Sequence, residues 1–181
     1  PKSAGLLYVR KDKQAGIRPL TISHGANSPR TDRSRFQIEF AWMGTRDPTA
    51  ALSVPFVLDY LGRLIPGGWP QLMERNRHLA LTARRIFCQS YNTPIPSPDS
   101  MIGSLVSIPI AESRVSQPSL IPFFLDHWQD ELMKRCSIEV PIIPWPAYPK
   151  RLVRFSAQVY NYISQYDLLG EGIKELGDDQ V

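Results

Sequence analysis

The sequence contains few of the residues that most often mark a chemical site. It has two cysteines and three histidines among 181 residues, and neither set shows the spacing of a metal site. Cys88 and Cys136 lie far apart, and Cys88 falls in an apolar pattern typical of a helix core. Both cysteines fit a reducing compartment, so we expect a cytoplasmic protein. A single disulfide between them stays an alternative.

Sequence motifs of several large enzyme classes are also missing. There is no H-E-x-x-H, no G-x-S-x-G, no P-loop and no G-x-G-x-x-G, so zinc-enzyme, serine-hydrolase and NTPase readings lack support. Gly67 and Gly68 read as a hinge between helices. The chain has no run of 18 apolar residues, and we expect no membrane span.

The charge balance is only slightly basic. The chain carries 21 Lys and Arg against 17 Asp and Glu, a net charge of +4. A nucleic-acid surface would need basic residues interleaved with aromatic ones. The nearest candidate, formed by Arg30, Arg33 and Arg35, lacks aromatic neighbours and reads as a solvated loop. We therefore expect no nucleic-acid partner.

A content of 43% hydrophobic residues is enough for a folded core, and 17 prolines mark many turns. Apolar runs and alternation predict strands; they cover residues 6–9, 36–42, 103–110, 138–143 and 152–157, with a further extended piece at 17–22. Periodic apolar faces predict helices; they cover residues 47–64, 70–91 and 120–134, and a last helix capped by Asn161. Pro55 lies inside the first helix, where a kink or a restart is expected.

The elements suggest a domain boundary between residues 45 and 70. The edge of one domain would lie before it, and a smaller α/β domain after it. The first predicted strand, at 6–9, starts with no element leading into it, which favours a truncated chain.

One helix start has the features of an anion-binding site. Asp47 suits the N-cap position and Pro48 the first helical position. The free N–H groups and the helix dipole favour negative charge there. Gly44 allows close approach of a ligand, Thr45 offers a hydroxyl, and Arg46 offers a planar cation. The alternative is a well-capped helix after a tight turn.

Arg154 is the second candidate. It lies inside the apolar strand pattern at 152–156, where a charged residue is rarely buried without a partner. Its guanidinium suits a substrate carboxylate. The alternative is an arginine on an edge strand that faces water.

Five stretches together resemble the C-terminal part of the class V aminotransferase family, and most of all its isopenicillin N epimerase-like subgroup. Members of this family use pyridoxal 5′-phosphate (PLP) on the fold-type I scaffold. The stretches are PKSAGLLYVR at 1–10, ISHG at 22–25, WMGTRD at 42–47, PGGW at 66–69 and VRFSAQVYN at 153–161.

The resemblance implies an α/β fold divided into three parts. Residues 1–46 would be a remnant of the large PLP-binding domain, and 47–70 a linking helix and hinge. Residues 71–181 would form a small C-terminal α/β domain with a short, mainly antiparallel sheet. The lysine that forms the Schiff base with PLP is expected upstream of Pro1, so this chain would supply no catalytic residue and be inactive alone.

The resemblance also assigns two binding positions. Gly44 and Thr45 match a pair that contacts the PLP phosphate of the neighbouring subunit, which implies a homodimer with a shared active site. Arg154 matches the arginine that binds the substrate α-carboxylate. The substrate would be a small amino acid, and the reaction at Cα an epimerisation, a transamination or an elimination. Cys136 lacks the flanking motif of the nucleophilic cysteine in cysteine desulfurases, which disfavours that chemistry.

A second hypothesis stays open. The chain would then be a non-catalytic α/β binding or dimerisation module for a phosphate-bearing ligand. Neither hypothesis requires a metal.

Overall fold

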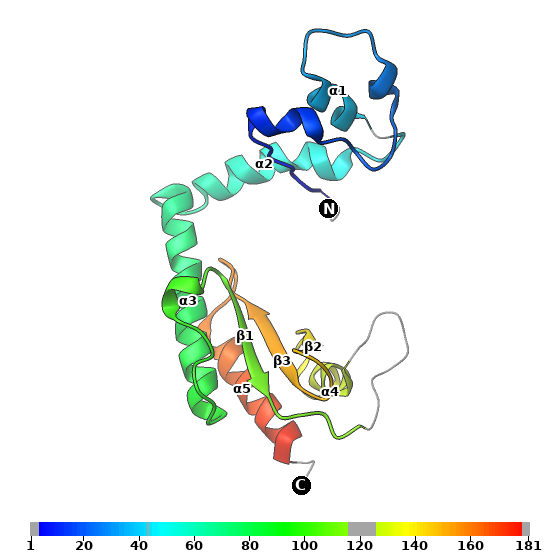
Figure 1. Cartoon of the computed structure of the whole chain (residues 1–181). Helices are drawn as coiled ribbons and strands as arrows, with labels where there is room; N and C mark the ends of the chain where they lie inside the picture. The colour runs from blue at the N-terminus through cyan, green and yellow to red at the C-terminus, as the bar shows by residue number, and fades with distance from the viewer. Residues whose placement is uncertain (1–3, 43, 116–125, 179–181) are drawn as a thin grey trace. The chain divides into compact units, whose positions relative to one another are not determined.

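The chain forms two compact units, and the boundary between them along the chain lies between Tyr60 and Leu61. Figure 1 shows their elements coloured from the N-terminus to the C-terminus. The structure is a computed structural model that describes residues 4–42, 44–115 and 126–178. The unit boundary falls inside the interval of 45–70. The three-part division of the chain stays a prediction.

The N-terminal unit consists of short helical elements. It contains the 3₁₀ helices η1 (Lys11–Gly16) and η2 (His24–Asn27), the helix α1 (Arg35–Ala41), and most of helix α2 (Thr49–Arg63). Helix α1 contacts both 3₁₀ helices, so the three form one small cluster.

The prediction of a strand at 36–42 is wrong, because this segment forms α1. The Ser34 hydroxyl accepts a hydrogen bond from the Gln37 backbone N–H, and the Gln37 side chain accepts one from the Ser34 N–H. This capping box starts a helix. Phe36 and Phe40 then lie one turn apart with ring centroids at 4.6 Å. Their spacing of four fits a helix as well as a strand.

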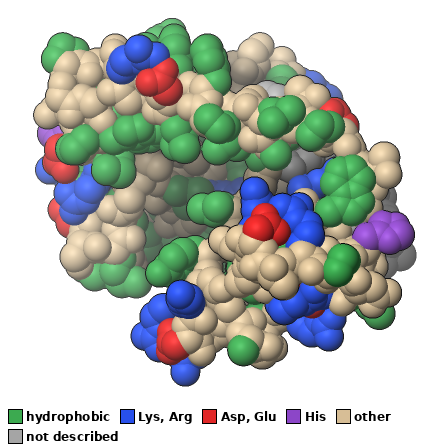
Figure 2. Space-filling model, turned by 90° about the horizontal axis from the view of Figure 1, so that it is seen from above, with side chains coloured by type: hydrophobic (Ala, Val, Ile, Leu, Met, Phe, Trp, Pro, Cys, Tyr) green, Lys and Arg blue, Asp and Glu red, His purple; other side chains and the backbone are tan. Residues whose placement is uncertain are grey.

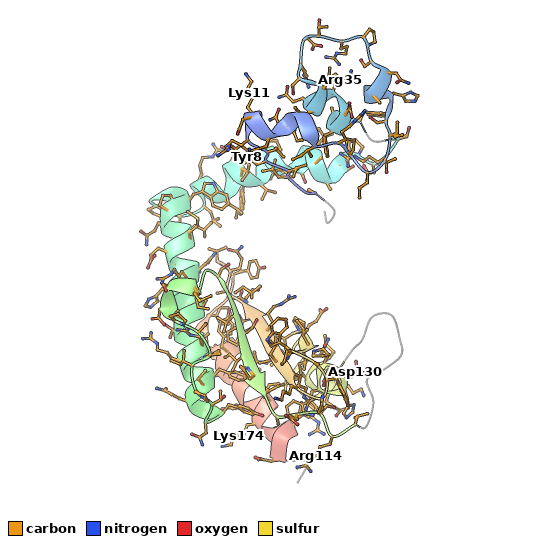
Figure 3. All side chains as sticks on the ribbon, viewed as in Figure 1. Tyr8, Lys11, Arg35, Arg114, Asp130 and Lys174 are labelled. Atoms are coloured by element: carbon orange, nitrogen blue, oxygen red, sulfur yellow. The ribbon has the colours of Figure 1, made fainter. Side chains whose placement is uncertain are left out.

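The predicted strand at 6–9 is also absent, and residues 4–10 have no regular secondary structure. The extended piece at 17–22 forms no strand either. A strand needs a partner for its backbone N–H and C=O groups, and the described part of the N-terminal unit contains no strand. Leu6 is 95% exposed and Tyr8 82% exposed. Figure 3 labels Tyr8 on this segment.

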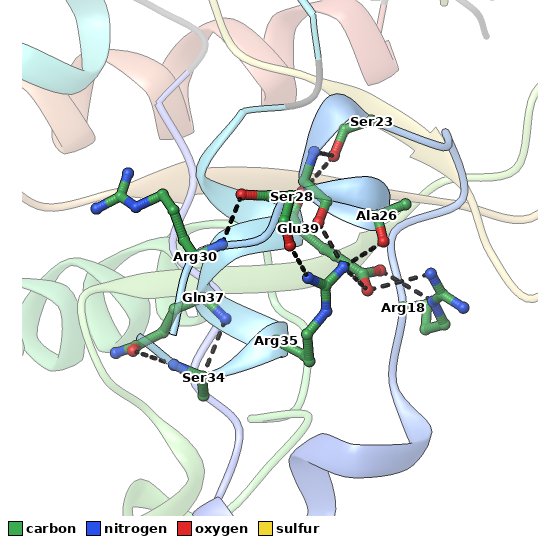
Figure 4. Close-up of polar contacts among 10 residues, drawn as sticks. Arg18, Ser23, Ala26, Ser28, Arg30, Ser34, Arg35, Gln37 and Glu39 are labelled. Carbon is green, nitrogen blue, oxygen red and sulfur yellow. Dashed lines mark hydrogen bonds and ion pairs between the residues drawn. The ribbon is translucent and has the colours of Figure 1, made fainter. Parts of the chain in front are cut away.

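A buried carboxylate connects the elements of the N-terminal unit (Figure 4). Glu39 accepts hydrogen bonds from Arg18 at 2.9 and 3.1 Å and from Arg35 at 3.3 Å. Arg35 also donates to the carbonyl oxygens of Gly25 and Ala26. The Arg18 guanidinium, followed by that of Arg35, lowers the pKa of Glu39. Arg35 is therefore a structural residue, and the prediction that it lies in a solvated loop is wrong.

Helix α2 confirms the helix predicted at 47–64 and runs without interruption through Pro55. None of its residues is buried. Large hydrophobic side chains along it are exposed: Leu52, Val54, Phe56, Val57, Leu58 and Tyr60. Figure 2 shows hydrophobic side chains on the face of the molecule turned toward the viewer.

The C-terminal unit contains a three-stranded sheet with three helices. The helices are α3 (Gly68–Ser90), α4 (His127–Cys136) and α5 (Ile163–Asp178), and a 3₁₀ turn, η3 (Asp99–Met101), follows α3. The strands are β1 (Leu105–Ile110), β2 (Ile142–Pro144) and β3 (Arg151–Ser156). Both pairs are antiparallel in the order β1-β3-β2. A small antiparallel sheet in an α/β unit is as predicted.

One face of this sheet forms the core with the helices. Inward residues of the strands alternate with outward ones, because side chains point to opposite faces in turn. Helix α5 contacts both α3 and α4, and Figure 1 shows it beside α3. The largest fully buried hydrophobic side chains are Trp128, Phe87, Leu72, Ile108, Leu132, Ile142, Ile173, Val106 and Val153.

Predicted boundaries in this unit hold to different degrees. The helix predicted at 70–91 corresponds to α3, and the strand at 152–157 to β3. The helix predicted at 120–134 is described only from residue 127, and residues 120–125 lie outside the described part. The strand predicted at 138–143 is shorter and shifted, since β2 begins at Ile142.

Candidate functional site

The segment around Gly44 lies in the N-terminal unit, beside a pocket. This pocket has a volume of about 340 Å³, and Ile22, Ser23, His24, Asn27 and Gly44 line it. The structure thus brings Gly44 together with residues of the ISHG stretch, which lies about twenty positions earlier in the chain.

The backbone at Gly44 requires glycine. Its φ is +123°, a conformation that side chains with a Cβ rarely adopt. No heavy atom lies within 4 Å of the place where a Cβ would stand. The space beside the backbone is therefore open to a ligand.

Three side chains close to Gly44 in the sequence or in the pocket could donate hydrogen bonds to an anion. Within the described residues, no hydrogen bond or ion pair occupies the side chains of Thr45, Arg46 or His24. Ser23 differs, because its hydroxyl donates to the Glu39 carbonyl and accepts from the Gly25 N–H. Ser23 is thus a structural residue of the pocket wall.

The helix that follows is capped as predicted, shifted by one residue. The Asp47 carboxylate accepts a hydrogen bond of 2.9 Å from the Thr49 backbone N–H and a second from the Thr49 hydroxyl. The Pro48 carbonyl accepts the first helical bond, from Leu52, at 2.9 Å. The hydroxyl bond, then the backbone bond, lowers the pKa of Asp47. Asp47 therefore bonds to the helix start as a cap does, but it lies one position before Pro48, which takes the N-cap place, so the prediction of Pro48 as the first helical residue is wrong.

Arg154 lies on β3 in the C-terminal unit. This strand is the central one of the sheet, so the edge-strand part of the alternative is wrong, although the side chain is exposed as that alternative expected. Arg154 pairs with Ser107 of β1, and its side chain points away from the core. No hydrogen bond or ion pair to a described residue occupies its guanidinium.

A pocket of about 520 Å³ opens beside Arg154. It lies beside the part of β3 that extends beyond the pairing with β2. There the Arg154 N–H donates to the carbonyl of Pro141, the residue that precedes β2. Phe155 and Tyr166 line the pocket, and burial, chiefly, raises the pKa of Tyr166. The rest of the lining is Leu105, Cys136, Ser137, Ile138, Glu139, Val140, Ser156, Gln158, Tyr160, Asn161, Gln165, Leu168 and Leu169.

Only some of the residues around Arg154 could be predicted from the sequence. Gln158 and Asn161 belong to the stretch that suggested Arg154, but their side chains carried no signal of a site. Cys136 is the last residue of α4, two residues beyond the predicted end of this helix, and it lines the same pocket. Both cysteines are free, so no disulfide joins them.

Two other classes of site are not seen. No group of three or more His, Cys, Asp or Glu among the described residues has the arrangement of a metal site. No described helix is long and apolar enough to cross a membrane.

Comparison with known proteins gives relatives along the whole chain, although no protein-family model matches it. A probable chloroplastic L-cysteine desulfhydrase of Arabidopsis thaliana is 27% identical over 187 residues, covering 99% of this chain and 38% of the relative. An L-cysteine desulfhydrase of the same plant is 27% identical over 199 residues, covering 100% of the chain and 41% of the relative. Isopenicillin N epimerase of Amycolatopsis lactamdurans is 28% identical over 187 residues, covering 97% and 44%.

These matches define the chain as a homologue of a group of enzymes. The group comprises L-cysteine desulfhydrases and isopenicillin N epimerase, so the resemblance indicated by the five stretches is confirmed. The chain spans about two fifths of the length of these relatives.

Proposed function

We propose that this chain is part of a PLP-dependent enzyme that acts at Cα of a small amino acid. Arg154 would bind the substrate carboxylate, and Gly44 and Thr45 the PLP phosphate in a site shared between two subunits. The observation that carries the proposal is the guanidinium of Arg154, which pairs with no described residue and lies beside a pocket of about 520 Å³. The relatives act, by their names, on L-cysteine and isopenicillin N.

The substrate-binding role follows from charge and position. A guanidinium on the central strand of a sheet is held by a rigid element, which favours accurate positioning. It can form two parallel hydrogen bonds to one carboxylate. This would fix the rotation of the amino acid, so that one bond at Cα takes the reactive orientation.

The residues around Gly44 fit a phosphate group. Gly44 leaves space beside the backbone, and Thr45 and Arg46 supply a neutral and a charged donor that no described residue occupies. The chemistry that PLP supplies when bound is withdrawal of electrons from Cα. This chain's own part is to hold the phosphate at Thr45 and the substrate carboxylate at Arg154.

The substrate-binding role can be tested on the 181-residue chain by NMR titration with L-alanine and L-alaninamide. L-Alanine should shift signals of the pocket residues, whereas L-alaninamide, which lacks the carboxylate, should bind more weakly. Arg154→Gln should weaken L-alanine binding about tenfold or more, because hydrogen bonds to charged groups contribute about 1.5–3 kcal/mol.

Arg114→Gln is the matched control. Arg114 is an exposed arginine outside the pocket, and Figure 3 labels it. This variant should bind L-alanine like the wild type. Equal affinities for Arg154→Gln and the wild type would remove Arg154 from the site and favour the alternative of a non-catalytic module.

A further inference from the structure

Gln158 lies in the same pocket as Arg154 and is held in place by its backbone. It follows the end of β3 by two residues. Its N–H donates a hydrogen bond of 3.0 Å to Oδ1 of Asn161, and its carbonyl accepts one of 2.8 Å from the Asn161 N–H. The main chain at Gln158 is therefore fixed on both sides.

The orientation of the Gln158 amide is fixed as well. Its Oε1 accepts hydrogen bonds of 2.8 Å from Nδ2 of Asn76 and of 2.8 Å from the Val159 N–H. Two donors saturate the two lone pairs of this oxygen and decide which end of the amide is oxygen. The Nε2 group must then point the other way, and no described residue accepts a hydrogen bond from it.

Asn76, which donates one of these two hydrogen bonds, comes from a distant part of the chain. It lies on α3, 82 positions before Gln158, and only 7% of it is exposed. Its Oδ1 is buried without a partner among the described residues. A buried polar atom without a hydrogen bond costs free energy, so the packing of the core alone gives no reason for an asparagine at this position.

We propose that Nε2 of Gln158 is a second donor, beside Arg154, for the carboxylate of the ligand, and that Asn76 is its positioning residue. The inference rests on the proposed function, since it takes the substrate carboxylate as the ligand. A carboxylate has about four lone-pair sites and can accept from a guanidinium and an amide together. The amide adds no charge, so it contributes direction, and its hydrogen bond is stronger to a carboxylate than to a neutral carbonyl.

The experiment is the NMR titration of the full 181-residue chain with L-alanine and L-alaninamide. The side-chain amide signals of Gln158 should shift with L-alanine. Gln158→Leu should weaken L-alanine binding about tenfold, the effect of losing one hydrogen bond to a charged group. L-Alaninamide binding should weaken much less, because a hydrogen bond to a neutral carbonyl is weaker than one to a carboxylate. Gln89→Leu, at an exposed glutamine on α3 that lies outside the pocket, should leave both affinities unchanged.

The role of Asn76 is tested by a double-mutant cycle. Asn76→Leu should weaken L-alanine binding by releasing the Gln158 amide. The double variant Asn76→Leu with Gln158→Leu should bind no more weakly than Gln158→Leu alone, because Asn76 acts through Gln158. A purely structural role would instead lower the affinities for L-alanine and L-alaninamide by the same factor, and would overturn the assignment of Asn76.

The outcomes separate the two proposals. If Arg154→Gln weakens L-alanine binding while Gln158→Leu does not, the inference fails and the proposed function stands. If L-alanine binds the wild type no better than L-alaninamide does, both fail. Should Asn76→Leu not fold, Gln158→Leu and the shift of its wild-type amide signals still decide the inference.

Discussion

Asp126 accepts a hydrogen bond of 2.6 Å from Nη1 of Arg151, and both side chains are only 3% exposed. Asp126 also caps α4 by accepting from the Trp128 N–H at 3.0 Å. The Arg151 guanidinium lies over the Trp128 ring, 3.9 Å from its centroid. The pair thus connects the start of α4 to β3, three residues before Arg154.

Removing one partner of this pair should destabilise the C-terminal unit. We expect Asp126→Ala to lower the free energy of unfolding by about 3–5 kcal/mol, because it leaves a buried guanidinium unpaired. Urea unfolding followed by circular dichroism measures the change. Glu171→Ala, at an exposed position on α5, should change it by less than about 0.5 kcal/mol.

Removing both charges should cost much less. The double variant Asp126→Leu with Arg151→Met replaces the pair by apolar side chains, which is often close to neutral. We expect it to be more stable than Asp126→Ala by roughly 1–4 kcal/mol. A double variant as unstable as Asp126→Ala would mean that the cap of α4, and not the buried charge, dominates.

Gly25 is predicted to tolerate no side chain. A Cβ built on it would lie 2.4 Å from the Ile38 carbonyl oxygen and 2.7 Å from Cα of Glu39, and both are backbone atoms. Gly25→Ala must therefore push η2 away from α1, at a cost of about 1–3 kcal/mol. Amide hydrogen exchange in α1 should become faster in this variant. Gly16→Ala, where a Cβ would meet nothing within 4 Å, should leave the exchange rates unchanged.

The sequence was a good guide to the C-terminal unit because its elements bury one face. The apolar positions of α3 and α5 recur at helical spacing, and β3 alternates between buried and outward residues. Local periodicity and burial therefore agree there. The strand β2 is shorter than predicted, because its pairing with β3 begins only at Ile142, after Pro141.

The N-terminal unit was predicted poorly because its local signals conflict. The spacing of Phe36, Ile38 and Phe40 satisfies a strand, yet the capping box at Ser34 decides for a helix. Arg154 and Gly44 were visible because charge or glycine is unusual in their patterns. Gln158 was not, since only the contact with Asn76, distant in sequence, orients its amide.

Phosphate binding at the Gly44 segment should depend on its backbone and on Thr45. Gly44→Ala should weaken binding of inorganic phosphate, because alanine disfavours φ = +123° and a shifted backbone would misplace the donors. Thr45→Val removes the hydroxyl at nearly constant shape and should weaken binding about tenfold or more, since a hydrogen bond to an anion contributes about 1.5–3 kcal/mol.

NMR shifts of residues 44–46 during a phosphate titration measure both effects. Thr31→Val is the control, because Thr31 is exposed in the same unit and lies outside the pocket. Phosphate affinity that is equal in Thr45→Val, Thr31→Val and the wild type would remove Thr45 from the site.

The start of α2 should lose its cap in acid. The hydrogen bonds from Thr49 lower the pKa of Asp47 in the folded chain, so protonation is harder there than in the unfolded chain, where the pKa is about 3.9. The contribution of Asp47 is thus fully present above that value and is lost as the pH falls through the lower folded pKa. Amide shifts and exchange rates of Thr49 and Ala50, followed from about pH 6 to about pH 3, report the change. Asp47→Asn keeps an oxygen acceptor that does not titrate, so its helix start should be independent of pH over this range. The same acid transition in Asp47→Asn and the wild type would assign the effect to another carboxylate.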